Sequence, residues 1–154
     1  NGNDIISLQD ELMHVKLYVK IQNLRFDDKI NLAFHVDEEI HSYSTLKTIL
    51  QPIVENSIIH GIFEKKEKTG AITISAKKTG QVIELVVEDD GIGMPDEILR
   101  QILLEDKAAH QHGYGAKNTN DRIKLYYGNE YGLTYCSEVG KGTSVKVRLP
   151  AIAL

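Results

Sequence analysis

Apolar residues between Leu8 and Phe26 recur every three to seven positions, close to the spacing of an amphipathic helix. The residues that carry this pattern are Leu8, Leu12, Val15, Val19 and Phe26. Ser7 suits the N-cap position, and Asp10 follows three residues later as an imperfect capping box. The pattern predicts a helix over 8–26 that enters the domain.

Alternation of apolar residues with polar or small ones over 29–37 predicts a strand. A helix is expected from Ser44 or Thr45, because apolar residues then follow a helical period, and Gly61 is expected to end it. Two β-branched segments, 71–78 and 81–89, flank a Thr79-Gly80 turn, which predicts an antiparallel hairpin.

The rest of the chain predicts a short helix over 96–104, with Pro95 in its first turn, and a polar loop over 105–117. A helix from about Asn118 to Gly128 follows, and then two strands around a Gly-Lys-Gly turn. This order of elements indicates an α+β fold, with helices on one face of a mostly antiparallel sheet.

Length and composition are those of one globular domain: 154 residues, 42% hydrophobic and 26% charged. The formal net charge of −4 argues against a nucleic-acid partner, since nucleic-acid binders gather Lys and Arg on one face. The single cysteine, Cys136, and the absence of an apolar run of membrane length favour a cytosolic chain without direct membrane contact. Because the sequence begins without methionine, we expect it to be part of a longer protein.

The segment VVEDDGIGMPDEIL (86–99) places acids and two glycines directly after a strand. Asp-Gly alone could form a hairpin turn, but no alternating strand returns after it. Alternatively, the carboxylate of Asp89 accepts a hydrogen bond from an exocyclic amine such as that of adenine, while Gly91 and Gly93 let a flat ring approach the backbone.

The segment LQPIVENSIIHG (50–61) carries polar residues on an otherwise apolar helix. Asn56 and His60 are four residues apart and share one flank, whereas Glu55 points about 100° away from Asn56. An amide oxygen on that flank could bind a hard cation, and an imidazole could reach a phosphate. A half-buried structural asparagine is the competing interpretation.

Two further glycine-rich segments follow. Gly113 and Gly115 precede a helix whose N-terminal N–H groups suit a phosphate, and Lys117 adds a positive charge. The sequence there does not match the GxxxxGK[ST] phosphate loop. Gly140 to Ser144, GKGTS, taken alone is more simply explained as a connection between strands.

In their order and spacing, these four segments resemble the ATP-binding catalytic domain of sensor histidine kinases, in the superfamily that also holds gyrase and MutL. LQPIVENSIIHG resembles the N box, EDDGIGM the first glycine box, GYGAKNTNDRI the second and GKGTSVKVRLP the third. The LytS-like and YesM-like branch is the most similar, and the resemblance covers nearly the whole chain. It implies a Bergerat-type two-layer α/β sandwich over 1–154, with helices on one face of a mixed, mostly antiparallel sheet. Residues 1–26 would be the helix entering from an upstream dimerisation and phosphoacceptor region.

The resemblance implies ATP and Mg²⁺ as cofactors and assigns roles to individual residues. Asp89 would bind the adenine amine, Asn56 would hold Mg²⁺, and Glu55 is the nearest candidate for an acid that activates water. The residues expected to bind the nucleotide are Asn56, His60, Asp89, Gly91, Gly93, Met94, Gly113, Gly115, Ala116, Lys117 and Thr143.

The sequence departs from the family pattern at several positions. Pro52 stands where gyrase-like relatives carry the acid that activates water, which leads us to expect slow net hydrolysis. Ile59 replaces a basic residue common in histidine kinases. No phosphoacceptor box occurs in the chain: His14 is best explained as a helix-surface residue, and His110 and His112 as part of a lid over the nucleotide.

The function implied is that of a two-component sensor histidine kinase. Its catalytic domain would bind Mg-ATP and donate the γ-phosphoryl group to a histidine outside this chain, from which a response-regulator aspartate receives it. The implied partners are the protein's own upstream helix, a response regulator and a second copy of the intact kinase. The implied location is the cytoplasmic side of a membrane-anchored bacterial sensor. The alternatives are a protein-serine kinase of the anti-sigma type and an ATP-sensing module without turnover.

Overall fold

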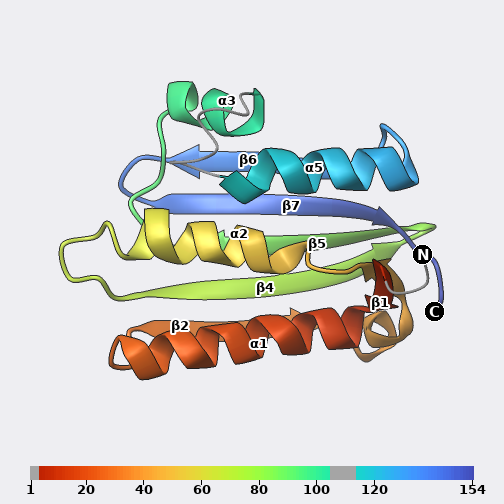
Figure 1. Ribbon diagram of the computed structural model, residues 1–154, viewed down its shortest axis with the longest axis horizontal. Coiled ribbons are helices and arrows are strands. Elements are labelled where there is room, and N and C mark those ends of the chain that lie inside the picture. The colour runs from red at the N-terminus through yellow and green to blue at the C-terminus, as the bar shows by residue number, and fades with distance from the viewer. Residues whose placement is uncertain (1–3, 105–113) are drawn as a thin grey trace.

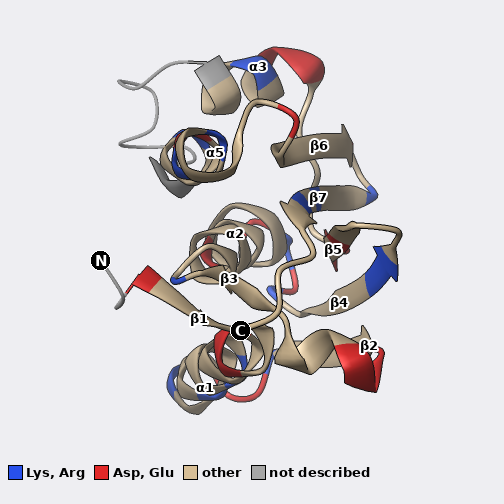
Figure 2. Ribbon diagram, turned by 90° about the vertical axis from the view of Figure 1, so that its right-hand side faces the viewer, with Lys and Arg blue, Asp and Glu red and all other residues tan. Residues whose placement is uncertain are grey.

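A computed structural model describes residues 4–104 and 114–154 as two layers, with helices packed against one face of a sheet (Figures 1 and 2). The helices are α1 (Leu8–Arg25), α2 (Leu50–Asn56), α3 (Asp96–Leu104) and α5 (Tyr114–Tyr127), with a 3₁₀-helix η2 (Glu38–Ser42) and a π-helix η3 (Ser57–Ile62). The strands are β1 (Ile5–Ser7), β2 (Ile30–Val36), β3 (Ser44–Leu46), β4 (Gly70–Thr79), β5 (Val82–Asp89), β6 (Gly132–Glu138) and β7 (Gly142–Pro150).

The main sheet has the strand order β2-β4-β5-β7-β6. Strand β2 is parallel to β4, and the other three neighbouring pairs are antiparallel. The short strands β1 and β3 form a separate antiparallel pair. The predicted α+β class and the mixed, mostly antiparallel sheet are therefore confirmed, and Figure 2 shows α1, α2 and α5 on the same side of the sheet.

The hydrophobic core fills the space between the two layers. Along most of β4, β5 and β7, buried residues alternate with partly or fully exposed ones, so every second side chain faces the helices. The largest fully buried side chains are Leu8, Ile40, Ile49, Leu50, Ile53, Ile58, Ile62, Ile72, Ile74, Ile83, Leu85 and Ile123. These residues belong to both layers, so burial of their apolar surface holds the helices against the sheet.

Helix α1 begins and ends as its sequence predicts. The Ser7 hydroxyl accepts a hydrogen bond from the Asp10 N–H at 3.0 Å, and the N–H of Phe26 donates to Gln22 at 2.9 Å. Asn23 then joins the helix to β2, because its side chain donates to and accepts from the backbone of Ile30, both at 2.9 Å. His14 is exposed, as expected for a helix-surface residue.

The prediction of a helix from Ser44 or Thr45 was wrong. Residues Ser44–Leu46 form β3, which pairs with β1, and the Ser44 N–H donates to Ile152 at 2.7 Å. Thr48 then adopts a positive φ of 60°, so the regular helix starts only at Leu50. Hydrogen bonds to distant segments determine the secondary structure of this region, and the spacing of its apolar residues does not indicate them.

The remaining elements lie close to their predicted positions. Gly80 has a φ of 61° in the β4–β5 turn, and α3 spans the predicted residues. Helix α5 starts at Tyr114, four residues before the expected Asn118, so the predicted loop over 105–117 is too long at its end. Among the described residues, no helix has the length and apolar character needed to cross a membrane.

Candidate functional site

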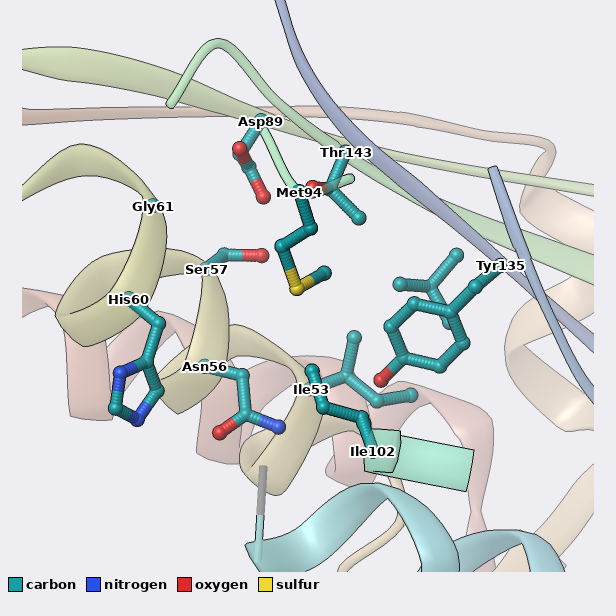
Figure 3. Close-up of a pocket in the computed structure, with 11 residues that line it drawn as sticks. Ile53, Asn56, Ser57, His60, Gly61, Asp89, Met94, Ile102, Tyr135 and Thr143 are labelled. Atoms are coloured by element: carbon teal, nitrogen blue, oxygen red, sulfur yellow. The ribbon is translucent and has the colours of Figure 1, made fainter. Parts of the chain in front are cut away.

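A pocket lies between α2 and η3 on one side and the ends of β5, β6 and β7 on the other (Figure 3). Its lining residues are Ile53, Asn56, Ser57, His60, Gly61, Asp89, Met94, Ile102, Tyr135, Thr143 and Val145. The cavity is about 30 Å³, whereas pockets that hold small molecules measure about 300–1,000 Å³. A nucleotide base therefore requires the pocket to widen, and the unbranched side chain of Met94, with three rotatable bonds, is the lining residue best suited to move.

Asp89 is the last residue of β5, and its carboxylate lies at one end of the pocket. One oxygen accepts a hydrogen bond from the Gly91 N–H at 2.9 Å. Burial raises the pKa of Asp89, and hydrogen bonds from Gly91, the Ser57 side chain and the Thr143 backbone oppose the rise. A partly buried carboxylate against an apolar cavity suits a ligand that donates a hydrogen bond.

Two glycines after Asp89 allow the backbone to pass close to its neighbours. A Cβ on Gly91 would lie 2.5 Å from the Cα of Gly61, and the Gly61 carbonyl accepts a hydrogen bond from Ile92 at 3.2 Å. Gly93 has a φ of 72°, and a Cβ there would overlap the carbonyl of Glu138. The glycines therefore bring the N-box segment and the β6–β7 turn against the end of β5.

Thr143 lies opposite Asp89 in the sheet register, and Ser137 lies opposite Thr143. The Ser137 and Thr143 hydroxyls are 2.7 Å apart, and Ser137 also accepts a hydrogen bond from the Met94 N–H at 2.8 Å. The third glycine segment, Gly140 to Ser144, is therefore joined to the first through Ser137 and Thr143, so it does more than connect two strands.

Asn56 ends α2, and the π-helix η3 begins at the next residue. The wider turn is marked by the hydrogen bond from the Phe63 N–H to Ile58, five residues earlier, at 2.8 Å. Both Asn56 and His60 line the pocket, as their spacing predicts. The π-helix also brings Gly61 against Gly91. The sequence predicted a regular α-helix here and did not indicate this contact.

Glu55 does not line the pocket. Its carboxylate accepts a hydrogen bond from Gln51 at 3.4 Å and lies near Tyr18 of α1. Burial, and then the charge of Glu55, raise the pKa of Tyr18 to about 12. The structure therefore separates Glu55 from Asn56, as the helical wheel indicates, and a catalytic role for Glu55 has no support from its position.

The second glycine segment is only partly described. Gly113 lies outside the described residues, as do His110 and His112. Gly115, Ala116 and Lys117 lie in the first turns of α5, where Ala116 is buried and the Lys117 ammonium forms a 2.6 Å ion pair with Asp121. Lys117 is therefore held by its own helix in this structure.

Sequence reasoning missed several residues of the site, among them Ser57, Ile102, Tyr135 and Ser137. Tyr135 and Ser137 are two residues apart on β6, so their side chains lie on the same face of the strand. Only the register with β7 places that face at the pocket. No group of three or more His, Cys, Asp or Glu residues in the described part of the chain could hold a metal ion.

Comparison with known proteins identifies the family. The family described as "Histidine kinase-, DNA gyrase B-, and HSP90-like ATPase" matches residues 41–153. The chain belongs to this family. The match includes every described residue that lines the pocket, so the pocket is part of the ATPase domain.

Curated relatives of this ATPase domain are named as sensor histidine kinases. Sensor histidine kinase YesM of Bacillus subtilis is 34% identical over 147 residues, which cover 96% of this chain and 24% of the relative. Sensor protein kinase HptS of Staphylococcus aureus is 32% identical, over 94% of this chain and 28% of the relative. The chain thus spans about a quarter of these relatives, and the resemblance to sensor histidine kinases is confirmed.

Solved structures show the same fold. The catalytic domain of histidine kinase ThkA has a TM-score of 0.75 at 15% sequence identity, over 96% of this chain and 97% of that domain. ThkA in complex with the response regulator protein TrrA matches with a TM-score of 0.66 at 15% identity, over 96% of this chain and 41% of that chain. These structures confirm the α+β sandwich expected of histidine kinase catalytic domains.

Proposed function

We propose that this domain binds Mg-ATP in the pocket around Asp89 and serves as the catalytic domain of a sensor histidine kinase. The observation that carries the proposal is the position of Asp89, a partly buried carboxylate that faces an apolar cavity and is held by the Gly91 N–H. Family membership supports ATP as the ligand.

The residues of the pocket fit a purine nucleotide. The carboxylate of Asp89 can accept a hydrogen bond from the exocyclic amine of adenine, whereas guanine presents a carbonyl oxygen at that position. Ile53, Met94 and Val145 provide apolar surface for the faces of the ring. The pocket would therefore prefer ATP over GTP.

Asn56 and His60 lie on the flank of the N-box helix that lines the pocket, where they could meet the phosphates. The amide oxygen of Asn56 would be the ligand for Mg²⁺, which typically takes few protein ligands together with phosphates and water. When bound, Mg²⁺ would neutralise phosphate charge, which phosphoryl transfer requires. Asn56 would thus position the Mg²⁺ ion, and His60 would donate a hydrogen bond to a phosphate oxygen.

Transfer would then occur from bound ATP to a histidine outside this chain. The bond between the γ-phosphorus and the β–γ bridging oxygen breaks, a phosphorus–nitrogen bond to the imidazole forms, and ADP leaves. A response-regulator aspartate would receive the phosphoryl group next; a response regulator is the partner in the ThkA complex. Because Glu55 lies away from the pocket, its carboxylate is not placed to activate water, so we expect net ATP hydrolysis to be slow.

Calorimetric titration with Mg-ATP and with Mg-GTP tests the proposed function. The unmodified chain should prefer ATP, and Asp89→Ala should abolish binding. Glu88→Gln is the matched control, because Glu88 is the exposed neighbour on β5 and should leave affinity unchanged. Equal affinity for ATP and GTP, or normal ATP binding by Asp89→Ala, would overturn the assignment of the pocket.

A longer protein that includes the upstream region tests the transfer step. Phosphohistidine is lost in acid, whereas phosphoserine survives, so acid treatment of the labelled protein distinguishes a histidine kinase from a serine kinase of the anti-sigma type. Normal ATP affinity without any transfer would favour an ATP-sensing module.

A further inference from the structure

Tyr135 of β6 places a buried hydroxyl group in the pocket that has no hydrogen-bond partner among the described residues. Figure 3 shows the hydroxyl at the inner end of the ring, pointing toward Ile53 and Ile102. Both neighbours are apolar, so the hydroxyl cannot be satisfied by them. A buried polar group without a partner costs stability, and few such groups occur in folded proteins, so this hydroxyl calls for an explanation.

The polar neighbour within reach is Asn56. Burial raises the pKa of Tyr135 well above its ordinary value, and the nearby Asn56 amide opposes that rise because it stabilises the ionised form of the hydroxyl. The two groups are thus near one another, although the neutral hydroxyl forms no complete hydrogen bond in this structure. In Figure 3 the nitrogen of the Asn56 amide lies on the side toward Tyr135, and the oxygen lies on the side toward His60.

The orientation of this amide decides what Asn56 can do. The amide oxygen accepts hydrogen bonds or binds a cation, whereas the NH₂ group only donates, so a reversed amide would present donors to a metal ion. A partner that accepts from the nitrogen would hold the oxygen on the other side. The tyrosine hydroxyl is such an acceptor, and it is presented by a strand of the sheet.

We propose that Tyr135 is a positioning residue for Asn56. When a nucleotide widens the pocket, the hydroxyl accepts a hydrogen bond from the Asn56 NH₂ group and keeps the amide oxygen toward the phosphates and their Mg²⁺. This inference rests on the proposed function, because it assumes that ATP binds in this pocket and that Asn56 is the metal ligand.

The test compares ATP affinity with and without Mg²⁺ for Tyr135→Phe and the unmodified chain. Mg²⁺ should raise the ATP affinity of the unmodified chain more than that of the variant, because the hydroxyl acts through the metal ligand. The factor by which Mg²⁺ raises affinity should be about five- to tenfold smaller in Tyr135→Phe, the range expected for one hydrogen bond. ATP affinity in EDTA should stay the same within about twofold. Tyr131→Phe is the matched control, because Tyr131 packs against Tyr127 and Arg148 outside the pocket lining.

Three results would overturn the inference. An equal loss with Mg²⁺ and with EDTA would mean that the hydroxyl contacts the nucleotide directly. An unchanged Mg²⁺ gain would mean that it does not orient Asn56. A lower melting temperature of Tyr135→Phe without ligand would mean that the hydroxyl is already paired in the empty protein. Failure of the unmodified chain to bind ATP would instead overturn the proposed function. The three results above concern only Tyr135 and do not affect that proposal.

Discussion

The carboxylate of Glu11 on α1 accepts a 2.9 Å hydrogen bond from the backbone N–H of Leu50, the first residue of α2. The same carboxylate accepts from Thr48 at 2.9 Å and from Ile49 at 2.8 Å, and Glu11 is only 1% exposed. The first N–H groups of a helix lack partners within it and carry partial positive charge, which a carboxylate satisfies. The N-terminal helix α1 therefore fixes the start of the helix that ends at Asn56.

Glu11→Ala is expected to lower the free energy of unfolding by about 2–4 kcal/mol, because it removes the acceptor of three N–H groups, of which those of Ile49 and Leu50 are buried. Glu11→Gln keeps one acceptor oxygen and should cost less. Urea denaturation measures both, with the exposed Glu64→Ala as a control expected to change stability by less than about 0.5 kcal/mol. A loss below about 1 kcal/mol for Glu11→Ala would show that water replaces the carboxylate.

Gly91→Ala should destabilise the protein by about 2–3 kcal/mol or more, since the added Cβ would lie 2.5 Å from the Cα of Gly61 and neither backbone segment can easily yield. Gly80→Ala is the comparison: Gly80 has a φ of 61° but open space around it, so only the backbone strain of about 1 kcal/mol remains. Thermal denaturation of both variants measures the difference. Equal effects would mean that the Gly61–Gly91 contact relaxes without cost.

The pH dependence of stability should reveal Asp89. Burial raises its pKa above the ordinary value of 3.8, so the folded state binds its proton more tightly than the unfolded state does. The stabilising contribution of the protonated carboxyl is complete below pH 3.8 and is lost as pH rises through the folded-state pKa.

Asp89→Asn removes this titration while keeping an acceptor oxygen for the Gly91 N–H. The variant should therefore gain stability relative to the unmodified chain as pH rises from about 4 to 7, measured by urea denaturation at each pH. A difference between the two proteins that stays constant over this range would mean that Asp89 titrates like an exposed carboxyl group.

Ser137→Ala should weaken the connection between the first glycine segment and the strands β6 and β7. The Met94 N–H loses its acceptor and the Thr143 hydroxyl loses its partner, so we expect a loss of about 1–2 kcal/mol in stability. ATP affinity should fall by about three- to tenfold because Met94 and Thr143 both line the pocket. Ser75→Ala, on the opposite face of the sheet, should change neither quantity. Unchanged ATP affinity in Ser137→Ala would show that Ser137 does not contribute to the binding site.

The elements with a strong local pattern were predictable from the sequence. Helix α1 was predicted with its Ser7 cap, and the β4–β5 hairpin with its Gly80 turn, because helical and strand periods are written in adjacent residues. Asp89, Gly91 and Gly93 were recognisable for a similar reason: they directly follow a strand, and the residues after them lack the alternation that a hairpin turn would require.

Other parts of the site could not be read from local pattern. The first turn of α2 depends on Glu11, 39 residues earlier in the chain, and Thr48, which has a positive φ, donates to the same carboxylate. The π-helix after Asn56 places Gly61 against Gly91. This contact arises from the packing of η3 against the end of β5, which no local pattern indicates.

The sequence by itself determined the elements with a clear local period, such as α1 and the β4–β5 hairpin, and where the acid and glycines stand, because each depends on neighbours within a few positions. Tertiary structure alone decided that Asp89, Thr143 and Ser137 form one row across three strands, and that Tyr135 lies near Asn56. Strand register and helix-to-sheet packing join residues far apart in the chain, and their energies depend on side chains that no local period encodes.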